Sequence, residues 1–249
     1  MAEAVVTMDG WCKLHDTRTF DWPSWKMIAE EERKAAINEF QEIMKKWDAV
    51  EENKEGSQSV YKVVGNKADL LFIFLRPTMD ELEEIKRDIN RSKLGHFLIP
   101  AYSYVSIVEM TMHNPMQEGK DRELSPAVEA RLKPILPKWE YACFYPMARR
   151  REQHANWFEI SKAERTRLLY EHGMTGRKYA GKVKEIISGS IGLDEWEWCV
   201  TLFAHDPLQF KKIVYEMRFD EVTTKFAEFG DFIIGAYLPE EDFAGYFEV

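Results

Sequence analysis

Two stretches of the chain repeat one pattern: an apolar run, a turn marked by proline, then an amphipathic helix. Residues 68–89 read ADLLFIFLRPTMDELEEIKRDI, and residues 196–217 read WEWCVTLFAHDPLQFKKIVYEM. Their apolar residues recur at helical spacing after the turn, which predicts one buried stripe on each helix. A shift of 128 residues aligns the two stripes, Leu82 with Phe210, Ile85 with Ile213 and Ile89 with Met217.

A second similarity precedes each of these stretches. A shift of 132 residues aligns Trp25, followed by EEERKAAINEF, with Trp157, followed by KAERTRLLYEH. Each half then reads strand, helix, strands, helix and final strand, the order of a ferredoxin-like α+β unit. The alternative is a coincidental periodicity without a structural repeat. The repeat predicts first strands at 10–16 and 139–145, with further strands of the first half at 58–64 and 103–110.

The repeat divides the chain into two halves joined by a linker. We expect an N-terminal half at 1–112, a linker at 113–138 and a C-terminal half at 139–249. The linker holds four of the ten prolines. Connections of this length are usually functional or mobile.

Composition limits the partners of the chain. Its 249 residues carry a net charge of −9, which argues against binding to nucleic acid or to an anionic membrane surface. The three cysteines form no CxxC pair, no apolar run approaches the length of a membrane span, and no signal peptide is visible. We therefore expect a cytoplasmic protein without a membrane span. Dinucleotide, P-loop and hydrolase motifs are also absent from the sequence.

His172 distinguishes the second half from the first. At the 132-residue shift it aligns with Phe40, so an imidazole replaces an aromatic core residue. Gly173 and Gly176 follow it and would let a flat group approach the backbone. His172 is therefore a candidate axial ligand to haem iron, and the alternative is an ordinary surface or core histidine.

The stretch FYPMARRR at 144–151 is a second candidate. Tyr145 ends a predicted strand, Pro146 interrupts the strand pairing, and three arginines follow. A phenol beside guanidinium groups suits a substrate that carries carboxylates, because guanidinium binds carboxylate through two hydrogen bonds. The alternative is a strand end that leads into a solvated charged loop.

Four long motifs carry a family resemblance: FYPMARR, YEHGMTGRKYAGKV, GSIGLDEWEWCVTLFAHDPLQFKKIVYEMRFDEV and FGDFIIGAYLP. With them the chain resembles the coproheme decarboxylases of Gram-positive bacteria, within the chlorite-dismutase-like superfamily. The similarity runs from the DGW at residues 9–11 to the C-terminus and is weakest at 113–130. It implies two ferredoxin-like halves that form an α+β barrel of the dimeric α+β barrel type, assembled into a ring-shaped homopentamer. The porphyrin would lie in the second half.

The resemblance also implies an activity. Such an enzyme binds iron-coproporphyrin III (coproheme) and uses hydrogen peroxide to convert two propionates to vinyl groups. The product is haem b, at the last step of the coproporphyrin-dependent route. The substrate is its own redox centre, and a ferrochelatase is the expected supplier by transient contact. The alternatives are a chlorite dismutase-like haem enzyme and a non-catalytic haem-binding or haem-transfer protein.

Site residues follow from the same resemblance. His172 would be the proximal iron ligand, and Tyr145 the catalytic tyrosine that forms a radical and abstracts hydrogen from a propionate. Because coproheme carries four propionates, the acidic chain must concentrate cations at the pocket. The expected coproheme-binding residues are Arg131, Tyr145, Pro146, Met147, Ala148, Arg149, Glu185, Arg218 and Thr223.

Three positions depart from the family pattern. Arg149 replaces a common lysine, and Thr223 replaces a common serine. Glu185 replaces a common glutamine on the distal side. A carboxylate there could act as a general base toward peroxide, repel anionic ligands, or turn away and pair with Lys182 or Lys184.

Overall fold

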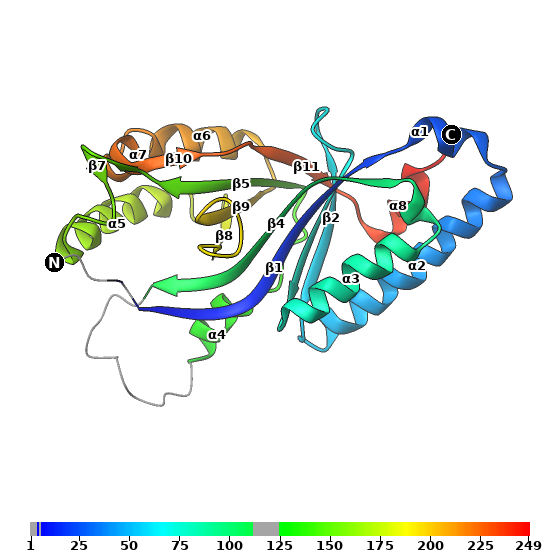
Figure 1. Cartoon of the computed structure of the whole chain (residues 1–249), viewed down its shortest axis with the longest axis horizontal. Coiled ribbons are helices and arrows are strands. Elements are labelled where there is room, and N and C mark those ends of the chain that lie inside the picture. Colours follow the sequence, from blue (N-terminus) through cyan, green and yellow to red (C-terminus); the bar gives the residue numbers. More distant parts are fainter. Residues whose placement is uncertain (1–3, 5, 112–124) are drawn as a thin grey trace. The chain divides into compact units, whose positions relative to one another are not determined.

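The computed structural model describes residues 4, 6–111 and 125–249 (Figure 1). Its contacts divide the chain into two compact units. Unit 1 comprises the described residues within 1–10, 106–132 and 139–232, and unit 2 those within 11–105, 133–138 and 233–249. In the described part of the chain, no helix is long and apolar enough to cross a membrane.

Unit 2 is an antiparallel sheet with two long helices packed on it (Figure 1). Its strands follow the order β11-β2-β3-β1, and β4 lies beside β1. α2 packs on β2, and α3 packs on β3. The strands are β1 (Thr7–Phe20), β2 (Ser57–Val63), β3 (Leu70–Arg76), β4 (Leu98–Thr111) and β11 (Ile233–Tyr237), and the helices are α1 (Trp22–Met27), α2 (Glu30–Glu52), α3 (Met79–Arg91), the 3-10 turn η1 (Leu94–His96) and α8 (Glu240–Tyr246).

Unit 1 repeats this strand order with different elements. Its sheet runs β10-β5-β9-β8-β4. α6 packs on β9, and α5 contacts both α6 and α7. The strands are β5 (Tyr141–Arg149), β8 (Lys184–Gly189), β9 (Trp198–Ala204), β10 (Ala227–Phe229) and the short pair β6 (Arg151–Glu152) and β7 (Ala155–Asn156); the helices are α4 (Pro126–Leu132), α5 (Lys162–Arg177), α6 (Leu208–Met217) and α7 (Glu221–Phe226).

The predicted repeat is present as secondary structure. Both repeated stretches contain a strand followed by a helix, β3 with α3 and β9 with α6. β3 is buried at every position because it is paired on both sides and covered by α3. Of the aligned helical residues, all are buried except the half-buried Met217. The α+β class is confirmed.

The structure describes only part of the predicted linker at 113–138. Residues 112–124 lie outside the described residues, and 126–132 form the helix α4. The Ser125 side chain caps this helix and Pro126 occupies its first position, where a missing N–H costs nothing. The compact units also differ from the sequential halves, because β11 and α8 belong to unit 2. The halves at 1–112 and 139–249 are defined by the repeat and stay a prediction.

The start of α3 illustrates how local sequence fixes an element. Thr78 and Glu81 form a capping box, in which each side chain satisfies the backbone N–H of the other. We expect Thr78→Ala to lower the free energy of unfolding by about 1 kcal/mol, since Thr78 is exposed and its loss leaves no cavity. Thermal unfolding would measure this, and Thr78→Ser should retain the wild-type stability. An unchanged melting temperature for the alanine variant would contradict the prediction.

Candidate active site

Tyr145 lies inside β5 rather than at its end. β5 continues to Arg149, so the predicted interruption at Pro146 is wrong. Pro146 stands opposite Cys199, and its carbonyl accepts the Gly230 N–H at 2.9 Å, so the strand stays paired although proline brings no N–H.

Aromatic rings enclose the Tyr145 side chain, which is 5% exposed. Its ring stacks on Phe232 with 4.3 Å between centroids and meets Phe229 edge-on at 5.8 Å. Burial raises the pKa of Tyr145 well above its ordinary value, and the negative charge of Glu185 adds to this effect. The positive charge of Arg218 opposes it. The phenol is therefore protonated at neutral pH.

Arg218 approaches the same aromatic group from α6. It caps the C-terminus of that helix, and its guanidinium carbon lies 5.2 Å from the centroid of the Phe229 ring. The side chain is exposed, so it can reach a ligand beside Tyr145. The Phe229 ring thus contacts both the Arg218 guanidinium, through a cation–π interaction, and the ring of Tyr145, the predicted catalytic residue.

Glu185 lies on β8 with an exposed side chain. Although part of the side chain contacts solvent, nearby protein atoms reduce the hydration of the carboxylate, and this raises the pKa of Glu185. The charge of His172 partly opposes the shift. Among the described contacts, Glu185 forms no ion pair with Lys182 or Lys184. Electrostatic interaction therefore links Glu185 to both Tyr145 and His172.

His172 is held by a carboxylate that the sequence did not reveal. On α5, its Nδ1 lies 2.7 Å from Oδ2 of Asp220, and its side chain is 28% exposed. If Nδ1 carries the hydrogen and donates it to Asp220, Nε2 has a lone pair for a metal. An added Cβ at Gly173 would meet no atom within 4 Å, whereas one at Gly176 would lie 3.2 Å from Cε of Met217, so the helix surface after His172 is open at Gly173 but not at Gly176.

Asp220 is fixed in turn by α7. It caps that helix, with Oδ1 accepting the Thr223 N–H at 2.8 Å. Burial opposes ionisation, but the hydrogen bonds from His172 and Thr223 prevail and lower the pKa of Asp220. Asp220 is therefore an ionised, oriented acceptor for the imidazole. Thr223, one of the predicted substrate-contact residues, is buried in this cap.

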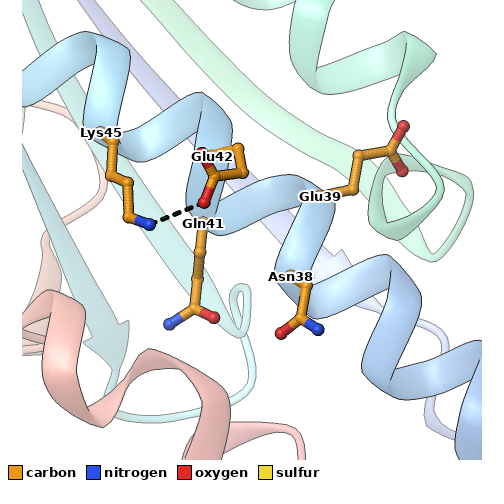
Figure 2. A pocket seen from close by; sticks show the side chains of 5 residues that line it. All are labelled: Asn38, Glu39, Gln41, Glu42 and Lys45. Atoms are coloured by element: carbon orange, nitrogen blue, oxygen red, sulfur yellow. Dashed lines mark hydrogen bonds and ion pairs between the residues drawn. The ribbon is translucent and has the colours of Figure 1, made fainter.

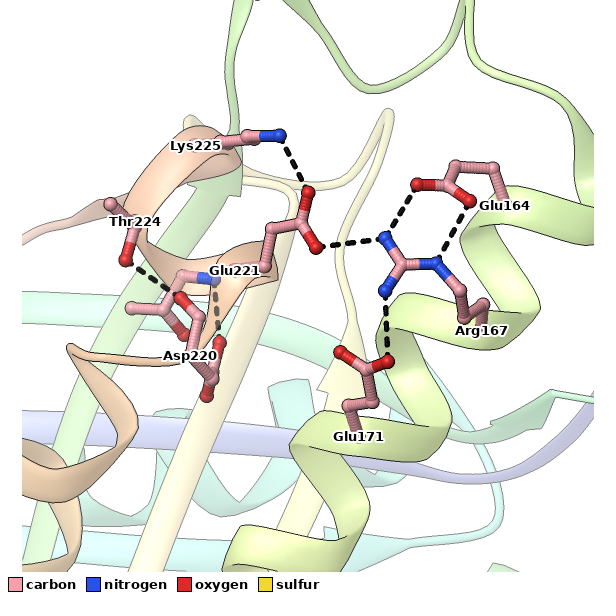
Figure 3. Close-up of polar contacts among 8 residues, drawn as sticks. Glu164, Arg167, Glu171, Asp220, Glu221, Thr224 and Lys225 are labelled. Carbon is pink, nitrogen blue, oxygen red and sulfur yellow. Dashed lines mark hydrogen bonds and ion pairs between the residues drawn. The ribbon is translucent and has the colours of Figure 1, made fainter.

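An ion-pair network joins the helices that carry His172 and Asp220 (Figure 3). Arg167 on α5 contacts Glu164 at 2.6 Å and Glu171 at 2.8 Å on its own helix, and Glu221 on α7 at 2.8 Å. Each exposed pair is weak, but one guanidinium that engages three carboxylates restrains both helices. By restraining α5 and α7, the network helps to keep Nδ1 of His172 within hydrogen-bonding distance of Asp220.

The remaining predicted site residues lie on β5 and α4. Met147 and Ala148 continue β5 and pair with β10, opposite Phe229 and Glu228. The Arg149 guanidinium lies 5.0 Å from the centroid of the Trp157 ring. Arg131 is exposed in the last turn of α4, and its place in a substrate site stays a prediction.

Two pockets lie in unit 2. One lies over α2 and is lined by Asn38, Glu39, Gln41, Glu42 and Lys45, with Lys45 paired to Glu42 at 2.6 Å (Figure 2). The other, of about 480 Å³, lies between α2, β2 and the start of α8 and is rich in carboxylates. Neither contains any residue of the predicted site.

Comparisons with known proteins identify the family of this chain. A family model described as chlorite dismutase matches residues 33–238, and the chain belongs to that family. More specifically, the chain is 72% identical over 249 residues to a coproheme decarboxylase of Oceanobacillus iheyensis, with all of both chains covered. The resemblance predicted from the motifs is therefore confirmed.

Solved structures agree with the fold. A haem-binding protein from Thermus thermophilus is 45% identical and superposes with a TM-score of 0.94, covering 99% of this chain and 98% of its own. A variant of the chlorite dismutase from Candidatus Nitrospira defluvii has a TM-score of 0.78 at 17% identity, covering 96% and 95%. That second likeness concerns the fold alone.

Proposed function

We propose that this chain is a coproheme decarboxylase that uses hydrogen peroxide to convert two propionates of iron-coproporphyrin III into vinyl groups, giving haem b. Each step consumes one propionate, one peroxide and one proton, and it yields one vinyl group, one carbon dioxide and two water molecules. The observation that carries the proposal is the His172–Asp220 pair at 2.7 Å in the same unit as Tyr145, within a chain 72% identical to an enzyme of that name.

The residues divide this work by their chemistry. His172 would bind the iron through Nε2, with Asp220 holding Nδ1. Tyr145, kept protonated by burial, would give up its phenolic hydrogen atom and then take one from the propionate β-carbon. Arg131, Arg149 and Arg218 would bind propionates, with Pro146, Met147, Ala148 and Thr223 shaping the pocket. Substrate positioning beside Tyr145 is then the main contribution of the protein to the rate.

The finer fold and assembly belong to the same proposal. We infer two ferredoxin-like halves, 1–112 and 139–249, that form an α+β barrel, because β2-β3-β1-β4 and β8-β9-β5-β10 share one strand order. A ring-shaped homopentamer, a cytoplasmic location and transient contact with a ferrochelatase follow from the family resemblance.

One experiment separates this function from its competitors. Purified protein loaded with coproheme is titrated with peroxide, and the bound porphyrin is analysed by mass spectrometry. Two successive losses of carbon dioxide and two hydrogens are expected. A non-catalytic haem-binding protein, the alternative favoured by the haem-binding structural relative, would give bleaching without these losses. A chlorite dismutase would instead release oxygen from chlorite.

Glu185 leads to a prediction about anionic ligands. We expect cyanide to bind the iron-loaded protein more weakly than it binds the Glu185→Gln variant near neutral pH, by about threefold to tenfold for one partly screened charge. Because the pKa of Glu185 is raised, the carboxylate becomes neutral as the pH falls through that value, and the difference should vanish there. Spectroscopic titration from about pH 5 to about pH 9 measures this. Equal affinities throughout would remove Glu185 from anion discrimination.

A further inference from the structure

Glu197 is a buried carboxylate that the proposed reaction does not use. It precedes β9 and is 7% exposed. Its Oε2 accepts the backbone N–H of Arg149 at 2.8 Å, and its own N–H donates to the carbonyl of Met147 at 3.1 Å. A second carboxylate oxygen lies 3.7 Å from the guanidinium of Arg151. A charged group is costly to bury, so these contacts indicate a specific task.

The contacts of Glu197 fix the end of β5. β10 pairs with the same residues from the other side, where Ala227 stands opposite Arg149. The N–H of Arg150 then donates to the carbonyl of Phe226 at 2.7 Å. The main chain at Arg149 is therefore restrained from both sides, by a side-chain carboxylate and by the neighbouring strand.

This restraint decides where the Arg149 guanidinium lies. Its carbon is 5.0 Å from the centroid of the Trp157 ring, and Trp157 belongs to a buried cluster with Leu168, Val222 and Phe226. Loss of water lowers the pKa of Arg149 to about 10, although the negative charges of Asp220 and Glu197 oppose this. Within the described contacts, the guanidinium forms no ion pair. A desolvated cation without a bound carboxylate is a receptor for one.

We infer that Glu197 is a positioning residue for substrate binding: it holds the backbone of Arg149 so that the guanidinium, stacked on Trp157, faces a carboxylate of the substrate. The inference deepens the proposed function and rests on it. Glu197 acts through Arg149, and it need not touch the substrate. Its effect on affinity must therefore disappear once Arg149 has lost its charge.

A double-mutant cycle on the full-length protein tests this relation. Coproheme affinity is measured by absorbance titration for the wild type, Glu197→Ala, Arg149→Met and the double variant. We expect Glu197→Ala to weaken binding about tenfold, because a displaced Arg149 loses its charge-assisted hydrogen bond to the substrate carboxylate. In the Arg149→Met background the same change should have no effect. Glu197→Gln should restore affinity, because its amide oxygen can still accept the Arg149 N–H.

Arg151→Ala serves as the matched control, since it removes only the other contact of Glu197 and should leave affinity unchanged. Glu197→Asp, which withdraws the carboxylate by one methylene, replaces the alanine variant if the latter does not fold. An equal loss in both backgrounds, or wild-type affinity of Glu197→Ala, would overturn the inference alone. Failure of the wild type to bind coproheme would overturn the proposed function, and the inference with it.

Discussion

The Tyr145→Phe variant is expected to bind coproheme with an affinity within about threefold of the wild type but to lose decarboxylation. Phenylalanine keeps the stacking on Phe232 at 4.3 Å and the edge contact with Phe229, so the strand and its aromatic surroundings remain. Only the hydroxyl is lost, and with it the hydrogen that the proposed mechanism transfers. The rate of vinyl formation should fall at least about a hundredfold, the scale of a positioned proton-transfer group. Mass spectrometry of the porphyrin after peroxide addition measures it.

Tyr141→Phe provides the control, because it makes the same change on the same strand. Tyr141 stands opposite Ala204, whereas Tyr145 stands opposite Val200, four residues further along β5. Tyr141→Phe should decarboxylate normally. Normal vinyl formation by Tyr145→Phe would remove Tyr145 from the mechanism and leave the iron-bound porphyrin to act on its propionates without a phenol.

The sequence predicted the repeated elements well because the signal is local. The apolar stripe of α3 and its Thr78–Glu81 box lie within a few residues of each other, so spacing alone identifies them. The course of the chain at Pro146 depends instead on Gly230, which reaches its carbonyl from a distant segment. The sequence does not predict α4, because prolines are typical of connections, whereas Pro126 begins a helix.

The residues of the candidate site also differ in whether a local sequence signal identifies them. His172 could be found because the repeat places an aromatic residue at the equivalent position, and Phe40 is indeed fully buried in α2. Asp220, its partner, is 48 residues away along the chain. The only local signal was the helix-start pattern of Asp220 before EVT, which predicts a cap and says nothing of an imidazole. Glu197 was equally hidden, because a carboxylate that binds a backbone N–H leaves no trace in spacing.

If His172 binds the iron as proposed, Asp220 is the residue through which the fold can set the strength of the iron–histidine bond. A carboxylate that accepts the Nδ1 hydrogen makes the imidazole more basic and fixes its plane. The pKa of Asp220 is lowered, so the carboxylate keeps its charge as the pH falls through the ordinary range of aspartate. The support for this geometry comes from α7, which Asp220 caps, and from the Arg167 network that joins α5 to α7 (Figure 3).

We therefore expect Asp220→Asn to weaken coproheme binding by about tenfold to a hundredfold, the usual effect of losing a partner of a metal-binding histidine. Asparagine caps a helix as well as aspartate does, so the free energy of unfolding should change little. Absorbance titration gives the affinity, and the iron–histidine stretching frequency of the reduced complex, which should fall, reports on the bond itself. Asp206→Asn is the control, because it makes the same change at the start of α6, where Asp206 accepts the Leu208 N–H and does not contact the imidazole. An unchanged frequency and affinity in Asp220→Asn would mean that His172 binds the iron without help from the carboxylate.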